Sequence, residues 1–517
     1  MSSTRPVLIS IKSNWESIAE RPIVGKDVLE LLSSSMYVNP LSIYREYLQN
    51  AADAIEEAVA LGLLSDRDGG RVDIQIDGDN RSVRIRDNGT GVPRSTFAKT
   101  LVALGASRKR GSKARGFRGV GRLGGLGYCQ ELIFRSRSDG EREINEMQWD
   151  CRRLKSILRD PGFDGDVEDL IRDVVRVQRT AGPDAPNHFF EVELRGIVRH
   201  GDDKLVNPSM VRDYLSQVSP VPFAPDFEFG KEIIAALQGK TTLGSVLVYL
   251  NGEQSPLFRP HRNEFQARKG VVDRFTGVRF YDIEGKDGTL AATGWILDHS
   301  YLGAIDTASF IKGVRLRSGN MQVGESDLLD HLFAEPRFNS WAVGEFHVLD
   351  ERILPNGRRD HFEQNVHFMK LLDELKPIAT DLTRRSRHSS LHRNALRQFE
   401  SAGERVVQNT SIIRQGVIGP RERRRLETET QDNLKQMERV ASHSSIGATE
   451  EAELSKRLRR ILARWEKALG SESAHSALKG LRSAERRAVE RVFALIYDCS
   501  SNRHGAKILI DRMLARL

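Results

Sequence analysis

Glu46, Asn50 and Asp53 are polar residues whose spacing suggests chemistry. They lie four and three residues apart within Leu41–Leu61, a segment whose apolar residues recur at helical spacing, so they share one face of an expected helix. A carboxylate placed one helical turn before Asn50 can act as a general base. Taken alone, such a polar stripe is more typical of a solvated helix face, so the interpretation depends on what else the chain contains.

A second element follows an expected strand. The stretch Arg81–Asp87 alternates in steps of two and ends at Asp87, after which Gly89 and Gly91 open a loop. Glycine lets the backbone approach a ligand closely. A neighbouring carboxylate can accept a hydrogen bond from an exocyclic amine such as that of adenine. On its own, the pattern Asp-x-Gly-x-Gly is also a common turn.

A third element, the stretch 104–128, is rich in glycine and in basic residues. So much glycine is incompatible with a rigid helix throughout and suits a mobile lid whose backbone N–H groups wrap phosphates, while the cations offset triphosphate charge. The alternative is a basic loop that binds RNA. The residues are Gly105, Gly111, Gly116, Gly119, Gly121, Gly124, Gly125 and Gly127, with Arg108, Lys109, Arg110, Lys113, Arg115, Arg118 and Arg122 among them.

Together, in this order and at this spacing, the three elements resemble the GHKL superfamily: gyrase-type topoisomerases, HtpG-type chaperones, sensor histidine kinases, MutL and MORC proteins. The helix is similar to the family's Glu-x-x-x-Asn box, DNGTG (87–91) to its adenine box, and the glycine-rich stretch to its lid. The sequence departs from the family in two places. GRLGGLG (121–127) has one extra residue before its last glycine, and HFFEVEL (188–194) lacks a threonine that many relatives carry.

The resemblance implies ATP and Mg²⁺ as ligands, and ATP hydrolysis as the activity. Glu46 would orient and deprotonate the attacking water, Asn50 would ligate the magnesium ion, and Asp87 would bind the adenine amino group. The other cofactor-binding residues that it implies are Gly89 and Gly91 around adenine, and Asp53, Lys109, Gly119, Gly121, Gly124, Gly125 and Gly127.

In the chaperone and MutL/MORC branches, a second α+β domain contributes a basic residue to the γ-phosphate. The segment LPNGRRDHFEQN (354–365) resembles the chaperone segment Asn-x-Ser-Arg-Glu, with Asn356, Arg359 and Asp360 at the matching positions. Arg359 is therefore the second expected catalytic residue. Three alternatives remain open at this stage: Arg358, Arg315 and Arg317.

Helical and strand patterns alternate in the first part of the chain and predict an α+β fold with an N-terminal Bergerat-type sandwich. We expect three regions: an ATP-binding domain over 1–200, a transducer-like α+β domain over 201–380, and a helical region over 381–517. The acidic stretch 160–187 reads as a long surface connection. Apolar residues recur at helical spacing in Leu454–Leu469 and Val489–Ile496, which predicts helices that dimerise.

The composition of the chain indicates a cellular compartment more clearly than it indicates a binding partner. The chain has 517 residues and a net charge of +8, a modest excess for its length. Its three cysteines form no Cys-x-x-Cys pair, which argues against a zinc site or disulfide framework and favours a reducing cytoplasm. No apolar run reaches the length of a membrane span, so we expect no membrane association.

The primary hypothesis is a homodimeric, ATP-driven clamp that resembles HtpG-type chaperones and acts on a protein client. The alternative is a MORC- or MutL-like ATPase that acts on nucleic acid in genome defence, with the basic segments 384–397 and 421–425 as its contacts. A third reading is an ATP-binding scaffold that hardly hydrolyses.

Overall fold

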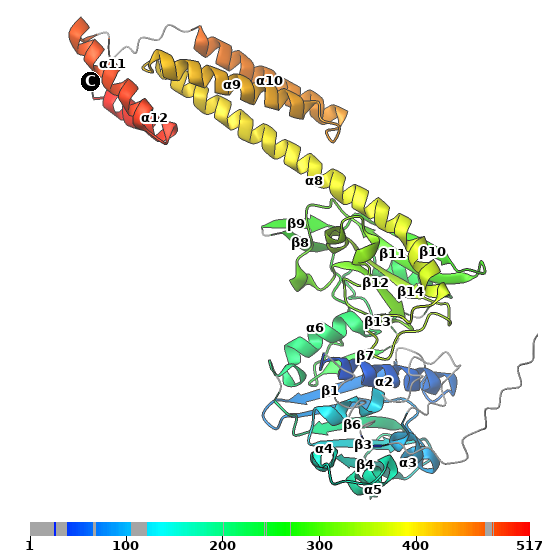
Figure 1. Cartoon of the computed structure of the whole chain (residues 1–517). Helices are drawn as coiled ribbons and strands as arrows, with labels where there is room; N and C mark the ends of the chain where they lie inside the picture. The colour runs from blue at the N-terminus through cyan, green and yellow to red at the C-terminus, as the bar shows by residue number, and fades with distance from the viewer. Residues whose placement is uncertain are drawn as a thin grey trace, which may run out of the picture.

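The computed structural model describes residues 25–26, 39–65, 69–104, 121–199, 201–241, 243–244, 246–268, 270–470, 478 and 480–516. These residues form an elongated molecule (Figure 1). Two α+β units, each a sheet with its helices and here called the first and second layers, lie at one end. A long helix leads from the second layer to a group of helices at the other end. The α+β fold with a helical C-terminal region is therefore confirmed.

The first layer is built on a seven-stranded sheet with the order β5-β4-β3-β6-β2-β1-β7. Neighbouring strands are antiparallel except for β1 and β7, which are parallel. The expected hairpin forms between β1 and β2, with Ile74 opposite Ile85. The strands are β1 (Arg71–Asp77), β2 (Ser82–Asp87), β3 (Glu131–Arg137), β4 (Glu143–Asp150), β5 (Val175–Ala181), β6 (Phe189–Arg195) and β7 (Leu247–Leu250).

Helices and 3₁₀ segments complete the first layer. Its core joins Leu48 and Ile55 of the first helix to Val72 and Phe134 of the sheet. Because Leu48 and Ile55 are buried in this core, the polar residues of the same helix lie on a different face. The elements are α2 (Ser42–Ala60), α3 (Arg94–Val102), η2 (Gly121–Gly127), α4 (Cys151–Arg159), α5 (Val167–Val174), η3 (Lys204–Val206) and α6 (Pro208–Val218).

The first layer continues past residue 200, where we expected a domain boundary. Helix α6 contributes Val211 and Leu215 to its core, and β7 contributes Val248 and the seventh strand. The apolar run of β7 indicates a strand, but its parallel partner β1 lies far away in the sequence. The sequence pattern of β7 alone therefore could not show which sheet the strand joins.

The segment 160–187 is not the surface connection that we expected. It contains α5 and then β5, which is an edge strand of the first sheet. Most side chains of β5 are exposed, so the strand lacks the apolar alternation by which a half-buried strand is recognised.

The second layer is built on a five-stranded sheet with the order β10-β11-β14-β12-β13, beside a two-stranded sheet of β8 and β9. Strands β12 and β14 run parallel and place Arg315 opposite Glu345. The elements are α7 (Gly230–Leu237), β8 (Glu264–Arg268), β9 (Val271–Arg274), β10 (Gly277–Glu284), β11 (Leu290–Asp298), η4 (Thr307–Ser309), β12 (Gly313–Ser318), β13 (Met321–Val323), η5 (Asp330–Leu332), η6 (Pro336–Trp341) and β14 (Val343–Val348).

Helix α8 (Val366–Gln415) connects the second layer to the C-terminal helices (Figure 1). The Asn365 side chain caps its first turn by accepting hydrogen bonds from the backbone N–H groups of His367 and Phe368. Phe368 belongs to the core of the second layer, whereas Phe399 belongs to that of the helical region. The remaining helices are α9 (Pro420–Ala441), α10 (Ala448–Leu469), α11 (Ser483–Cys499) and α12 (Arg503–Leu514).

The described residues can also be compared with what we expected of membrane spans, metal ligands and cysteines. Among the described residues, no helix is long and apolar enough to cross a membrane, and no three His, Cys, Asp or Glu side chains are grouped as metal ligands. Cys129 and Cys151 are buried free thiols with sulfur atoms 3.8 Å apart, although they are separated in sequence, and Cys499 is exposed.

Candidate functional site

Helix α2 carries the expected polar face. The Glu46 side chain lies in a buried position, with the residue 8% exposed, and Asp53 is buried as well. Asn50, between them, is half-buried. Because Glu46 and Asp53 are buried although they carry carboxylates, this polar face is not an ordinary solvated helix face. They lie where other elements of the fold cover the helix.

The end of the glycine-rich stretch covers Glu46. A Cβ atom added at Gly121 would lie 2.2 Å from Oε2 of Glu46, and one added at Gly125 would lie 2.7 Å from the hydroxyl oxygen of Tyr47. That hydroxyl donates a hydrogen bond to the Arg122 carbonyl oxygen at 3.1 Å. Glycine is thus required for η2 to approach α2 this closely.

The other expected lid residues divide into two groups. Gly124 and Gly127 lie in the 3₁₀ segment η2 with Gly121 and Gly125. Lys109 and Gly119 lie outside the described residues. The end of the glycine-rich stretch therefore forms a short 3₁₀ segment that lies against α2.

The loop after β2 also lies against α2. Asp87, which is 5% exposed, accepts a hydrogen bond from the Gly89 backbone N–H at 2.9 Å. The Thr90 N–H donates to the Ala54 carbonyl oxygen at 3.3 Å, and a Cβ atom on Gly89 would lie 2.6 Å from that of Ala54. Gly91 has a φ of 67°, which favours glycine. The loop therefore holds the Asp87 carboxylate beside the helix that carries Glu46 and Asn50.

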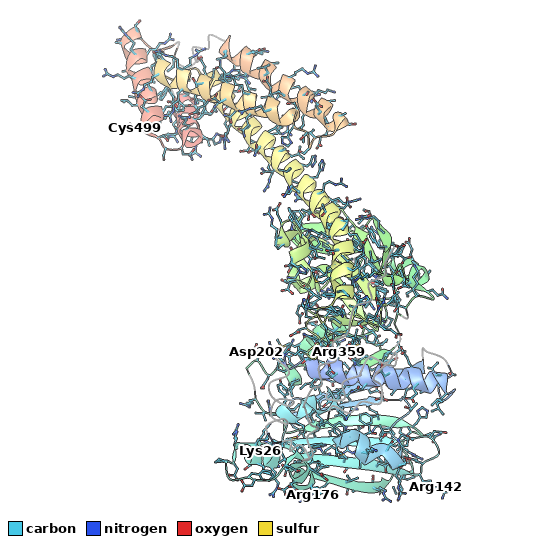
Figure 2. All side chains as sticks on the ribbon, turned by 45° about the vertical axis from the view of Figure 1, so that its right-hand side comes forward. Lys26, Arg142, Arg176, Asp202, Arg359 and Cys499 are labelled. Atoms are coloured by element: carbon cyan, nitrogen blue, oxygen red, sulfur yellow. The ribbon has the colours of Figure 1, made fainter. Side chains whose placement is uncertain are left out.

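Arg359 reaches the same helix from the second layer. Its Nε atom lies 3.7 Å from Oε1 of Glu46. Figure 2 shows Arg359 at the junction between α2 and the second layer. The guanidinium group of Arg45, the neighbour of Glu46, donates a hydrogen bond to the Arg358 carbonyl oxygen at 2.7 Å. The loop 354–363 is thus held against α2 by both charge and hydrogen bonding.

Arg315 and Arg317, the competing candidates, lie in the interior of the second layer. Arg315 donates a hydrogen bond to the Phe310 carbonyl oxygen at 2.6 Å. Arg317 lies 2.7 Å from the Glu345 carboxylate. Of the four arginines that the sequence left open, Arg359 is the one whose side chain the structure pairs with Glu46.

Sequence reasoning missed Arg45 and Tyr47, which flank Glu46. Arg45 holds the loop that carries Arg359, and Tyr47 holds η2. Both lie within the motif YREYLQN, but their partners are backbone carbonyl groups far away in the sequence. Every residue has a backbone carbonyl group, so the sequence does not show which one a side chain will bind, and motif spacing could not predict these contacts.

Comparisons with known proteins agree with this geometry. Residues 41–158 match the family described as "Histidine kinase-, DNA gyrase B-, and HSP90-like ATPase". Chaperone protein HtpG from Klebsiella pneumoniae subsp. pneumoniae, Enterobacter sp. (strain 638) and Escherichia coli (strain K12) is in each case 27% identical to this chain over 211 residues. Each alignment covers 38% of this chain and 30% of the relative, so the chain spans less than a third of the curated relatives that it matches.

The matched range contains α2, the Asp87 loop and η2, which the fold brings together. The motifs, their placement and the family match therefore identify the same part of the chain. These agreements support the assignment of residues 41–158 to the GHKL ATPase superfamily.

Proposed function

We propose that this chain binds ATP and Mg²⁺ at α2, hydrolyses ATP, and uses the cycle to drive a conformational clamp that acts on a protein client. The family match supports the nucleotide, and the partial similarity to HtpG supports the chaperone-like use. The single observation that carries the proposal is the Glu46–Arg359 pair, because it joins the ATPase domain to the second layer.

The residues present fit a nucleotide with its metal ion. Oε1 of Glu46 is buried and accepts no hydrogen bond from the described residues, and Gly121 leaves no side chain between η2 and that carboxylate. Asp87 would accept a hydrogen bond from the adenine amino group, and the Asn50 side-chain oxygen would hold the magnesium ion. Bound magnesium would supply positive charge to the phosphates.

Hydrolysis needs a base for the attacking water and a cation for the terminal phosphate. Glu46 would take a proton from water as the water oxygen bonds to the γ-phosphorus, while the bond to the ADP oxygen breaks. Arg359 would stabilise negative charge on the transferred group. A γ-phosphate would compete with Glu46 for Arg359, so nucleotide binding would free the Glu46 carboxylate and change the contact between the two layers.

The charge distribution favours a protein client over nucleic acid. Within the two basic segments, several arginines are paired with carboxylates instead of forming a continuous cationic surface. These pairs are Arg384 and Arg385 with Asp381, Arg387 with Glu335, Arg423 with Glu427, and Arg425 with Glu429. Pairing of this kind is typical of solvated helix faces.

The test is the ATP turnover of the full chain with Mg²⁺, measured alone and with an unfolded protein, duplex DNA or RNA. We expect slow hydrolysis that the unfolded protein changes and that the nucleic acids leave unaltered. Absence of hydrolysis despite ATP binding would identify a nucleotide-binding scaffold. Stimulation by DNA, together with sub-micromolar DNA binding at physiological salt, would replace the protein client with nucleic acid.

A further inference from the structure

A buried ion cluster lies in the second layer, outside the nucleotide site. Glu345 on β14 is 1% exposed and contacts two buried arginines, Arg259 and Arg317. Burial lowers the pKa of Arg259 to about 10, so its guanidinium group remains charged at neutral pH. Burial alone would raise the pKa of Glu345, but Arg259 and Arg317 hold it well below its usual range. The cluster is therefore ionised inside the protein.

Arg317 extends from Glu345 to the end of α6, and Arg259 extends to the segment that follows it. Arg317 donates hydrogen bonds to the carbonyl oxygens of Gln217 at 2.6 Å and Ser219 at 3.4 Å. Arg259 donates to the Val221 carbonyl oxygen at 3.0 Å. Carbonyl groups at a helix C-terminus lack intrahelical partners and carry partial negative charge, so cations stabilise them. Arg317 thus holds the C-terminal end of α6, and Arg259 holds the chain just after it.

Helix α6 in turn lies against the catalytic helix. Val211 and Leu215 of α6 share the core of the first layer with Leu48 of α2. The hydroxyl group of Tyr44, two residues before Glu46, donates a hydrogen bond to the Leu205 carbonyl oxygen just before α6. A displacement of α6 would therefore be transmitted to α2.

The same arginines also hold the β12–β13 hairpin. Asn320, in its turn, accepts a hydrogen bond from Arg259 at its side-chain oxygen (2.6 Å) and one from Arg317 at its carbonyl oxygen (3.1 Å). The residue after β13, Gly324, donates its backbone N–H to the Arg359 carbonyl oxygen at 2.9 Å. The cluster thus connects to Arg359 as well as to α2.

We propose that Glu345, Arg259 and Arg317 form a positioning cluster that sets the separation of Glu46 and Arg359, by fixing α6 on one side and the β12–β13 hairpin on the other. This inference rests on the proposed ATPase function. The three residues are positioning residues, since the contacts described for them do not reach Glu46 or Arg359 directly. Buried ion pairs often contribute little net stability, whereas the planar guanidinium fork fixes direction.

The first test separates catalysis from nucleotide binding. The double variant Arg317→Met with Glu345→Gln removes one cation and one anion, so the net charge of the interior is unchanged. We expect kcat to fall about 10- to 100-fold, because small misplacements of catalytic groups have effects of this order. KM for ATP should stay within about twofold, since the contacts described for the cluster do not include the Asp87 loop.

The matched control is Arg279→Met with Asp298→Asn. This pair, with Nη2 and Oδ1 2.9 Å apart, joins β10 and β11 of the same sheet, and its described contacts do not include α6 or the loop 354–363. We expect the control variant to have the kcat and the KM for ATP of the wild-type protein. An equal loss of kcat in the control, or a loss of ATP binding in the cluster variant, would overturn the proposal.

A second variant guards against misfolding of the first. Arg317→Lys keeps the charge but cannot bridge Glu345 and the α6 carbonyl groups with one planar fork. It should lower kcat in the same direction by a smaller factor and leave KM unchanged. Wild-type kcat in a folded Arg317→Lys protein would contradict a positioning role for the fork.

A distance measurement tests the cluster without depending on hydrolysis. Spin labels would be placed at the exposed residues Glu57 on α2 and Lys286 between β10 and β11, in a Cys499→Ser background. We expect a narrow distance distribution in the unmodified cluster and in the Arg279/Asp298 control, and a broader one in Arg317→Met/Glu345→Gln. An unchanged distribution would overturn the positioning role even if the chain proves not to hydrolyse ATP.

Discussion

Arg359 Nε lies 3.7 Å from Glu46 Oε1, and the backbone of Arg359 adopts the left-handed conformation, with a φ of 56°. A residue other than glycine in this region costs about 1–3 kcal/mol and persists only where the surroundings fix it. Here the Arg359 N–H donates to the Asn356 carbonyl oxygen at 3.1 Å, and its own carbonyl oxygen accepts from Gly324 at 2.9 Å. The strained turn therefore directs the guanidinium group of Arg359 towards Glu46 on α2.

Replacing Asp87 tests the adenine site. Asp87→Asn should weaken ATP binding about 10- to 100-fold, since the loss of a hydrogen bond to a charged group costs about 1.5–3 kcal/mol and the new amide group presents a donor to the amino group of adenine. Calorimetry measures this affinity. Asp77→Asn, at the exposed end of the neighbouring strand β1, should bind ATP as the wild type does. Unchanged affinity in Asp87→Asn would place the adenine pocket elsewhere.

Adding a methyl group at Gly121 tests the contact between η2 and Glu46. The new Cβ would lie 2.2 Å from Glu46 Oε2, so Gly121→Ala must displace the carboxylate. We expect turnover to fall about 100-fold, the order of effect of a misplaced catalytic group, with ATP still bound. The control is Gly78→Ala, whose Cβ would meet the Val206 carbonyl oxygen at an ordinary 3.8 Å. Wild-type turnover in Gly121→Ala would show that the close approach has no role in catalysis.

The helix and the strand that carry the proposed nucleotide-binding residues were predictable because each pattern is local. Glu46, Asn50 and Asp53 follow from helical spacing, and Asp87 follows from a strand that runs into glycines. The contacts that join these motifs were not predictable in the same way. The pairing of Arg359, and not of the other three arginines, with Glu46 depends on where a loop of the second layer lies. The hydrogen bond from Arg45 goes to a backbone carbonyl group, which the side-chain sequence does not identify.

The end of the first layer was the least predictable feature of the fold. Strand β7 pairs in parallel with β1, and α6 lies against α2, although both follow residue 200. Pairing of distant segments depends on tertiary packing, which hydrophobic periodicity does not encode. Periodicity did predict the C-terminal helices, since long helices with one apolar stripe carry a strong local signal.

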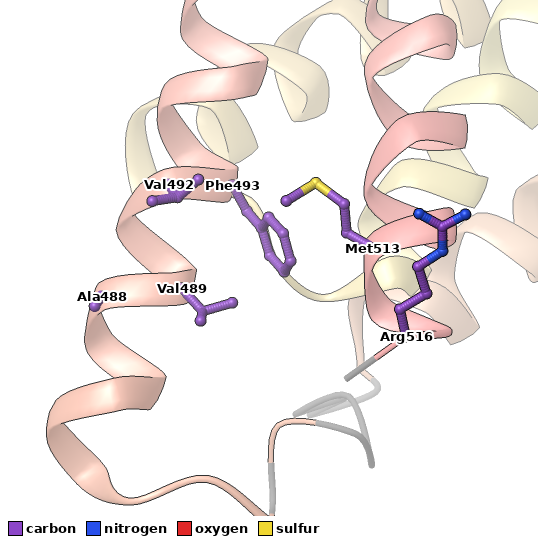
Figure 3. A pocket seen from close by; sticks show the side chains of 6 residues that line it. All are labelled: Ala488, Val489, Val492, Phe493, Met513 and Arg516. Atoms are coloured by element: carbon purple, nitrogen blue, oxygen red, sulfur yellow. The ribbon is translucent and has the colours of Figure 1, made fainter.

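The C-terminal helices are expected to dimerise through α11 and α12. Their exposed apolar residues include Val492, Leu495, Ile508 and Leu509, with Leu495 54% exposed. Figure 3 shows a pocket that Val492 lines together with Val489 and Phe493 of α11 and Met513 of α12. Exposed apolar side chains beside an apolar pocket are typical of an interaction site.

Charge placed on this surface should separate the dimer. We expect Val492→Lys with Leu495→Lys to sediment as a monomer, as should a truncation at about residue 380. Leu391→Lys, which places a charge at an exposed position of α8, should remain dimeric. A wild-type chain that is already monomeric at micromolar concentration would contradict dimerisation.

The ion pairs on the first sheet predict a pH dependence of stability. Arg135 contacts Glu193 at 2.6 Å and Glu191 at 2.7 Å across neighbouring strands. Burial would raise the pKa of Glu193, but hydrogen bonds from Arg195 and Arg135 lower it to about 2. A lowered folded-state pKa gives stability that is fully present above the unfolded pKa, near 4.5, and is lost as pH falls towards 2.

Urea unfolding at a series of pH values measures this contribution. The free energy of unfolding should fall between pH 5 and pH 2, and Glu193→Gln should be less stable at pH 7 and lose part of that slope. Glu143→Gln, which replaces an exposed carboxylate at the start of β4, should retain the slope. An identical pH profile for Glu193→Gln and the wild type would contradict the assigned pairing.

Single-turnover hydrolysis of ATP with Mg²⁺ tests the central claim most directly. Glu46→Gln should lower the rate about 10²–10⁴-fold while ATP still binds, as expected for loss of a general base. Arg359→Ala should lower it about 10²–10³-fold, as expected for loss of a group that stabilises transition-state charge. Arg358→Ala keeps the carbonyl group that Arg45 contacts and should remain near the wild-type rate. Full activity in Glu46→Gln, or equal losses in the two arginine variants, would contradict the account.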